Sequence, residues 1–202
     1  MAYAPPVLAN EVLPRRAVIS AALVIGFALL TAAAAQIRIP LGFTPVPITG
    51  QTFAVLLSGA VIGSRRGAAS QFAYVLMGAA GLPFYAGGES GRSVVTGATG
   101  GYLLGFVAAA WLVGRLAEAR QDRKVSTAIG VFLTGNFVIY AFGIGGLMIA
   151  TEMTLEGAVA NGMAPFIIGD TLKVLLAAGL LPAAWRLTGK LDDRAVPGTD
   201  LS

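Results

Sequence analysis

Six long apolar segments alternate with short polar segments along the chain. A helix that crosses a bilayer needs about 20 mostly apolar residues, and the first, fifth and sixth segments reach that length. The second and third segments are shorter, so we expect them to be tilted or to have their ends covered by neighbouring helices. The six are Ala17–Ile37, Thr49–Ile62, Ala68–Ala80, Thr99–Val113, Val125–Thr151 and Pro165–Trp185.

The composition points the same way. The chain is 56% hydrophobic and only 12% charged, whereas soluble domains are about 25% charged. Neither a sequence repeat nor a separate soluble domain is evident. We therefore predict an all-α integral membrane protein with one domain over residues 1–190, built as a bundle of six transmembrane helices, and a disordered cytoplasmic tail over residues 191–202.

The basic residues predict the orientation of the bundle. If the N-terminus is cytoplasmic, eleven of the fourteen Lys and Arg residues lie on the cytoplasmic side, Arg38 and Arg92 lie outside, and Lys173 lies within a span. This asymmetry fits the positive-inside rule, so we expect both termini in the cytoplasm of a bacterial inner membrane. An alternative is that the first apolar segment is a cleaved signal peptide, but its uncharged run is longer than usual and no polar mature domain follows it.

Three loops then face outward: Arg38–Ile48, Gly81–Ala98 and Glu152–Ala164. The first holds three prolines, which fix φ and predict an extended, stiff loop. The second is rich in glycine, and composition alone favours a flexible linker. Its interleaved Phe84, Tyr85 and Arg92 favour a folded lid instead.

The strongest candidate site is an acid and a base inside the last apolar segment. Asp170 and Lys173 are three residues apart, a spacing that puts both side chains on one face of a helix. Charges within a span are costly, and their default interpretation is a functional site that faces the protein interior. A structural ion pair is the alternative. With the helix starting at Pro165, Asp170 lies about 7–8 Å below the outer end, at 1.5 Å per residue.

Other polar residues near the outer ends of the spans are ambiguous. Gln51 and Thr52 serve equally well as ligand contacts or as helix–helix hydrogen bonds. Tyr102 fits a ligand contact or the interfacial aromatic belt. The glycines at 143, 145 and 146 are more typical of helix packing than of nucleotide binding.

Several classes of function are disfavoured. The chain contains neither cysteine nor histidine, which removes thiolate chemistry, the usual general base and the commonest metal ligand. No nucleotide-binding P-loop pattern is present, so any ATP hydrolysis belongs to another chain. Only one acid lies in a span, too few for a metal cluster or a two-carboxylate hydrolase. The basic residues sit in short loops, which does not indicate nucleic-acid binding.

Three strings together resemble the BioY family, the biotin-specific substrate-binding (S) components of energy-coupling factor (ECF) transporters. They are TPVPITGQTF (Thr44–Phe53), GATGGYLLGF (Gly97–Phe106) and PFIIGDTLK (Pro165–Lys173), and the resemblance extends over about Ala17–Trp185. It departs from the family at Ala98, where proline is usual. The resemblance implies a biotin-binding membrane subunit without a cofactor, partnered by a transmembrane coupling protein and two ATP-hydrolysing subunits.

The resemblance also suggests roles for individual residues. Asp170 would accept from the ureido N–H groups of biotin, and Lys173 would donate to its carbonyl or neutralise Asp170. Arg92, or else Arg38, would bind the valerate carboxylate. The apolar walls would come from three aromatic residues, Tyr85, Phe43 and Tyr102.

A partner surface is expected on the first span. It carries two small-x-x-x-small pairs, Ala17 with Ala21 and Ala28 with Ala32, and such pairs let helix backbones approach closely. Packing inside the chain's own bundle is equally compatible with the pattern. The resemblance favours docking to the coupling protein, with Ala17 and Ala21 nearer the cytoplasmic side. A self-contained secondary transporter that uses Asp170 as a proton-linked carboxylate is the alternative function.

Overall fold

The computed structural model describes residues 7–13 and 17–195, and within these ranges the chain is predominantly helical. The longer helices are α2 (Ala17–Gln36), α3 (Gln51–Ile62), α4 (Ser64–Ala79), α6 (Gly100–Glu118), α7 (Val125–Thr151) and α9 (Ile167–Ala195). They coincide with the six predicted apolar segments to within a few residues at most ends. In the described part of the chain, four stretches are long and apolar enough to cross a membrane: α2, α6, α7 and Leu155–Thr188. The prediction of an α-helical, multi-pass membrane protein is therefore confirmed.

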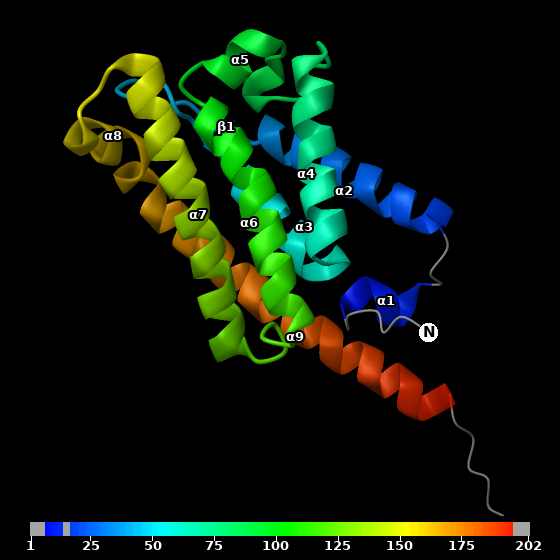
Figure 1. Cartoon of the computed structure of the whole chain (residues 1–202). Helices are drawn as coiled ribbons and strands as arrows, with labels where there is room; N and C mark the ends of the chain where they lie inside the picture. Colours follow the sequence, from blue (N-terminus) through cyan, green and yellow to red (C-terminus); the bar gives the residue numbers. More distant parts are fainter. Residues whose placement is uncertain (1–6, 14–16, 196–202) are drawn as a thin grey trace, which may run out of the picture.

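Helix α6 lies at the centre of the bundle, packed against α3, α4 and α7 (Figure 1). Small residues make this close packing possible. A Cβ atom on Gly59 would lie 2.3 Å from the carbonyl oxygen of Ala110, and one on Gly101 would lie 2.8 Å from the Cα atom of Gly146. Backbones in direct contact are typical of helices that associate in lipid, where hydrophobicity does not drive them together. Gly146 thus serves helix packing, as its sequence context indicated.

A single glycine separates α3 from α4. Gly63 has φ of +85°, a conformation that a residue with a Cβ rarely adopts. A side chain of α6 caps the first turn of α4, because Glu118 accepts hydrogen bonds from the backbone N–H and the hydroxyl of Ser64, both at 2.8 Å. The short second and third apolar segments are in this way tied to the central helix.

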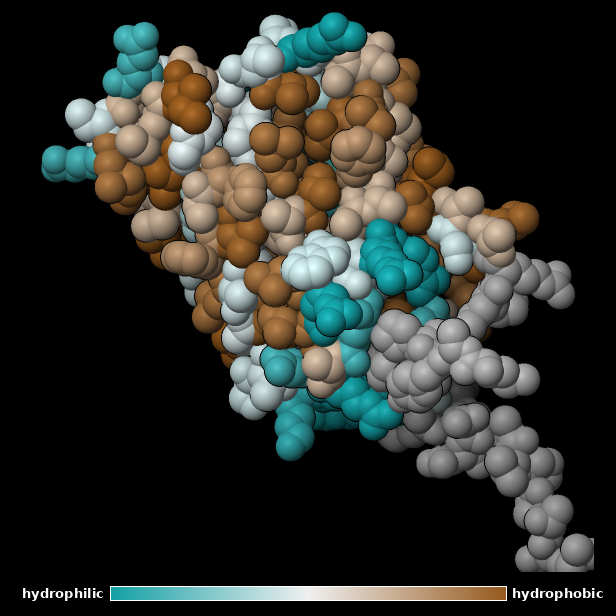
Figure 2. All heavy atoms as spheres, viewed as in Figure 1, coloured by the Kyte–Doolittle hydropathy of each residue, from teal (hydrophilic) through white to brown (hydrophobic). Residues whose placement is uncertain are grey.

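The short elements gather at one end of the bundle, at the top of Figure 1. They are strands β1 (Arg38–Ile39) and β2 (Ile48–Thr49), the 3-10 turns η1 (Ala86–Gly88) and η2 (Ala164–Phe166), and helices α5 (Arg92–Thr96) and α8 (Leu155–Gly162). Figure 2, in the same view as Figure 1, shows apolar side chains over the middle of the bundle and most polar side chains toward its two ends.

The two longer loops at this end are folded. The proline-rich loop begins and ends in an antiparallel strand pair, with Arg38 opposite Thr49, a hairpin that the sequence analysis did not predict. In the glycine-rich loop, Tyr85 is 1% exposed and donates a hydrogen bond to the carbonyl of Val75 at 2.7 Å. The aromatic residues therefore indicated its folded state correctly.

The opposite end carries a polar cluster between α6 and α9. The indole N–H of Trp185 donates to Asp122 Oδ2 at 2.7 Å, and the Arg123 guanidinium lies 4.1 Å above the Trp185 ring. Asp122 is fully buried, and this burial raises the pKa of its carboxyl group above its ordinary value. Helix α1 (Leu8–Val12) packs nearby against α3 and α9.

The tail differs from its prediction. Helix α9 continues to Ala195, so residues 191–195, expected in the tail, have helical backbone. The rest of the expected tail, residues 196–202, lies outside the described residues.

Candidate functional site

A cavity lies at the end of the bundle where the short elements gather. It has about 770 Å³ of empty space when the open solvent at its mouth is included. Its walls come from both strands, η1, η2 and helices α3, α5, α6, α7 and α9. Apolar and aromatic side chains form most of the lining, among them Val46, Val94, Leu103, Phe106, Ile139 and Phe166.

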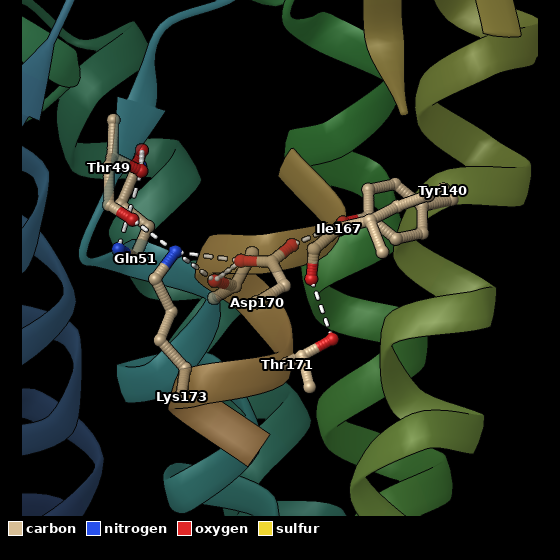
Figure 3. A network of polar contacts seen from close by, with 8 residues as sticks. Thr49, Gln51, Tyr140, Ile167, Asp170, Thr171 and Lys173 are labelled. Atoms are coloured by element: carbon tan, nitrogen blue, oxygen red, sulfur yellow. Dashed lines mark hydrogen bonds and ion pairs between the residues drawn. The ribbon is translucent and has the colours of Figure 1, made fainter. Parts of the chain in front are cut away.

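The predicted acid and base both line this cavity. Lys173 Nζ lies 2.7 Å from Asp170 Oδ1, and the two side chains are only 19% and 6% exposed. Asp170 also accepts hydrogen bonds from the hydroxyls of Thr52, at 2.9 Å, and of Tyr140. Figure 3 shows this network, in which α3, α7 and α9 meet at one carboxylate. Both roles considered for the pair are thus compatible with one arrangement.

The hydrogen-bond capacity of the two charged groups differs. An ammonium group has three N–H donors, and Lys173 directs them to Asp170 Oδ1, to the Thr49 carbonyl at 2.6 Å and to the Thr52 hydroxyl at 3.0 Å. A carboxylate offers about four lone-pair positions, and three of those on Asp170 accept from Lys173, Thr52 and Tyr140. Asp170 can therefore accept from a ligand without losing a partner, whereas Lys173 must release one to donate.

Two further polar side chains, Gln51 and Tyr102, line the cavity near α3 and α6. Gln51, 6% exposed, donates to the Tyr74 hydroxyl at 2.6 Å and accepts from the Thr49 hydroxyl at 2.8 Å. Tyr102 donates to the carbonyl of Gly162 at 2.6 Å, so its ring is held against the cavity by α8. Each of these residues makes internal hydrogen bonds and also faces the cavity.

The rim of the cavity carries a second charged pair. Arg38 Nη1 lies 3.9 Å from Glu89 Oε1, and the side chains are 35% and 56% exposed. Both residues line the cavity. The N–O distance in this pair is longer, and its side chains are more exposed to solvent, than in the pair formed by Asp170 and Lys173. The cavity therefore has one tight, buried ion pair and one loose, exposed pair.

A comparison with known families decides the affiliation of the chain. Residues 9–190 match the model of the BioY family. The chain belongs to the BioY family. The resemblance noted in the three sequence strings is thereby confirmed, and the match extends over most of the chain, not over one short motif.

Curated relatives give the same picture. A biotin transporter BioY from Thermotoga maritima is 40% identical over 152 residues, which cover 75% of this chain and 87% of that protein. A biotin transporter BioY from Rhodobacter capsulatus is 40% identical over 148 residues, or 68% and 77% of the two chains. A probable biotin transporter BioY from Pyrococcus horikoshii is 36% identical and covers 81% and 92%.

The fold of this BioY family member also matches a solved structure. The crystal structure of the S-component for biotin from an ECF-type ABC transporter superposes with a TM-score of 0.73 over 91% of this chain and 95% of that one. The sequence identity is 23%, so this match speaks for the arrangement of the helices and not for individual side chains.

The structure brings together five of the seven sequence-predicted ligand residues of this BioY family member. Asp170, Lys173, Tyr85, Tyr102 and Gln51 all line the cavity. Phe43 does not, because it lies in the loop of the hairpin with 65% of its surface exposed. Arg92 is also exposed and outside the lining, since it begins α5, and Arg38 is the arginine at the cavity.

Two residues of the network, Tyr140 and Thr49, were not predicted from the sequence. Tyr140 sits in the middle of the long apolar helix α7, where its hydroxyl reaches Asp170. A lone phenol in the interior of a span needs a partner there, and that signal was available. Thr49 contributes its backbone carbonyl to Lys173, and no side-chain pattern predicts a backbone contact.

Proposed function

We propose that this chain is the biotin-binding S component of an ATP-driven vitamin importer and that it captures biotin in the cavity described above. The observation that carries the proposal is the match to the BioY family over residues 9–190. The cavity supports it chemically, since apolar walls surround one buried carboxylate that still has acceptor capacity.

Biotin suits these groups. Its ureido ring has two N–H donors, one of which Asp170 can accept at its remaining lone-pair position, and a carbonyl that Lys173 can reach if it gives up one present partner. The ring sulfur and the alkyl chain need apolar surroundings, which Tyr102, Phe106 and Phe166 supply at the cavity wall. The proposed ligand contacts are therefore Asp170, Lys173, Gln51, Tyr85 and Tyr102 from the sequence analysis, with Tyr140 and Thr52 added.

The proposed topology has six membrane helices, α2, α3, α4, α6, α7 and α9, with the cavity outside and both termini in the cytoplasm. Support comes from the basic residues Arg115, Arg120, Arg123 and Lys124, which belong to the end of α6 and its connection to α7. This connection lies at the end of the bundle opposite the short elements (Figure 1). The proposed location is the inner membrane of a bacterial cell.

The proposed partners are a transmembrane coupling protein and two ATPase subunits, with α2 as the docking helix. Within the most apolar window of α2 only 17% is buried. Ala17 and Ala21 are exposed, whereas Ala28 and Ala32 are buried in the chain's own bundle. The first small-residue pair is therefore accessible to a partner helix, and the second is already used.

The decisive experiment is direct. The purified chain, in detergent and without nucleotide, should bind biotin in calorimetry and should carry biotin when isolated from cells. Strong binding of a different vitamin, with no heat from biotin, would refute the ligand assignment. Uptake that collapses with the proton gradient but survives ATP depletion would favour the self-contained transporter instead.

A further inference from the structure

We propose that Arg38 binds the terminal carboxylate of the ligand and that Glu89 is an internal competitor that this carboxylate displaces. The inference rests on the proposed function and deepens it, because it concerns how the same cavity selects a small molecule with one free carboxylate. It follows from the two charged pairs, which differ in how firmly their cations are held.

The charges that line the cavity are balanced. Among the described lining residues, the cations are Arg38 and Lys173 and the anions are Glu89 and Asp170. A monoanionic ligand that binds one of these cations therefore competes with the carboxylate already paired with it. When the ligand's carboxylate replaces the protein carboxylate, the cation still has one negative charge beside it.

Lys173 is not the cation that opens. Its three N–H donors are occupied at 2.6–3.0 Å, and its partner Asp170 is buried. Removing one member of a buried ion pair leaves an uncompensated charge, which is strongly unfavourable. Glu89, in contrast, has more than half of its side chain in solvent and stands 3.9 Å from Arg38. Exposed pairs of this kind contribute little, so an entering carboxylate replaces Glu89 at small cost.

Arg38 is held in place for this role. It lies on β1 directly opposite Thr49, the residue whose carbonyl accepts from Lys173. Its guanidinium also lies against the backbone of η1, since a Cβ atom on Gly87 would meet Arg38 Nη1 at 2.2 Å. Gly87 has φ of +75°, so glycine meets both the conformational and the steric requirement here.

Glu89 is presented by a separate, closed turn. The Tyr85 N–H donates to the Glu89 carbonyl at 3.0 Å, and the Gly88 N–H donates to the Tyr85 carbonyl at 3.1 Å. The side-chain amide of Gln36, on α2, donates a hydrogen bond to the Tyr85 carbonyl at 3.2 Å. The Glu89 backbone is thus fixed while its carboxylate remains free to swing into solvent when a ligand carboxylate binds Arg38.

The test compares biotin with biotin methyl ester, which lacks the charge but keeps the ureido ring. Calorimetry on the full chain would use Glu89→Gln, Arg38→Gln and the double variant. Glu89→Gln should tighten biotin binding about two- to fivefold, the value of losing an exposed competitor. Arg38→Gln should weaken it about tenfold or more. Ester affinity should stay the same in every variant, which also shows that the variants are folded.

The double variant and a matched control sharpen the test. Once Arg38 is replaced, the Glu89→Gln change should no longer alter biotin affinity. Glu156→Gln, an exposed acid of α8 outside the cavity lining, should change neither ligand's affinity. Weaker biotin binding by Glu89→Gln, or equal shifts for acid and ester, would overturn the exchange while leaving biotin capture intact. Wild-type protein that binds neither compound would overturn the proposed function itself and this inference with it.

Discussion

The ammonium group of Lys173 lies 2.7 Å from Asp170 Oδ1, and the two residues are one helical turn apart on α9. Their shared carboxylate is also bonded to α3 through Thr52 and to α7 through Tyr140. The cavity is therefore lined by an ion pair that joins three helices, and binding and stability are coupled at this point. Variants must be designed to separate the two effects.

Asp170→Asn should weaken biotin binding more than it destabilises the protein. The amide replaces one acceptor oxygen with a donor, which then faces a ureido N–H. Hydrogen bonds to a charged group contribute about 1.5–3 kcal/mol, so the affinity should fall about 10- to 150-fold. Calorimetry and thermal unfolding of the same sample measure both quantities. The double variant Asp170→Asn/Lys173→Gln should regain stability, since no lone charge is buried, without regaining affinity. Normal affinity with a large loss of stability would favour a purely structural pair.

Tyr140→Phe should lower biotin affinity through the orientation of Asp170. The substitution removes only the hydroxyl that donates to Asp170 Oδ2, and we expect a loss of about 3- to 10-fold. Thr171→Val is the matched control, because Thr171 follows Asp170 directly on α9. Its hydroxyl donates to the Ile167 carbonyl and not to Asp170 (Figure 3). Equal effects of both variants would contradict an orienting role for Tyr140.

The proposed topology predicts which single cysteines are accessible. The natural chain has no cysteine, so Arg120→Cys and Glu156→Cys can be made without background. A membrane-impermeant maleimide added to intact cells should label the α8 variant and leave the one at position 120 unlabelled until the membrane is opened. Labelling of position 120 from outside would invert the orientation.

Ala21→Trp should abolish partner-dependent uptake and leave biotin binding unchanged. The bulky ring blocks close approach to an exposed small-residue face of α2, and this face lies away from the cavity lining. Ala141→Trp, at an exposed alanine of α7, is the control and should transport normally. Lost binding or expression in Ala21→Trp alone would place this face inside the bundle, and full uptake would exclude it as the docking surface.

Asp122 should make stability depend on pH. Burial raises its pKa above the ordinary 3.8, so the unfolded chain releases this proton at lower pH than the folded chain. The folded state is then penalised as pH rises through the window between the two pKa values, and the penalty is absent below the unfolded value. Asp122→Asn removes the penalty, and its amide oxygen still accepts from Trp185. The variant should unfold at a higher temperature than the wild type at pH 7, and the difference should shrink toward about pH 4. A variant that is less stable at pH 7 would contradict this account.

Local features of the sequence determined much of this protein. Uninterrupted apolar runs predict where helices α2, α6, α7 and α9 lie, because a helix satisfies its own backbone in lipid. The three-residue spacing of Asp170 and Lys173 predicts that both face the same way. The same local reasoning found Gln51, Tyr85 and Tyr102, which sit beside a span end or in the glycine-rich loop.

Contacts between distant segments were decided only by the tertiary structure. The pairing of Arg38 with Thr49 selects Arg38 for the cavity and leaves Phe43 on an exposed loop. Arg92, the first residue of α5, is exposed and does not line the cavity. The partnership of Tyr140 with Asp170 depends on how α7 and α9 are rotated about their axes as they pack around α6. Hydrophobic patterns specify which residues avoid water, but both helices are apolar on nearly every side, so side-chain packing and hydrogen bonding set that rotation.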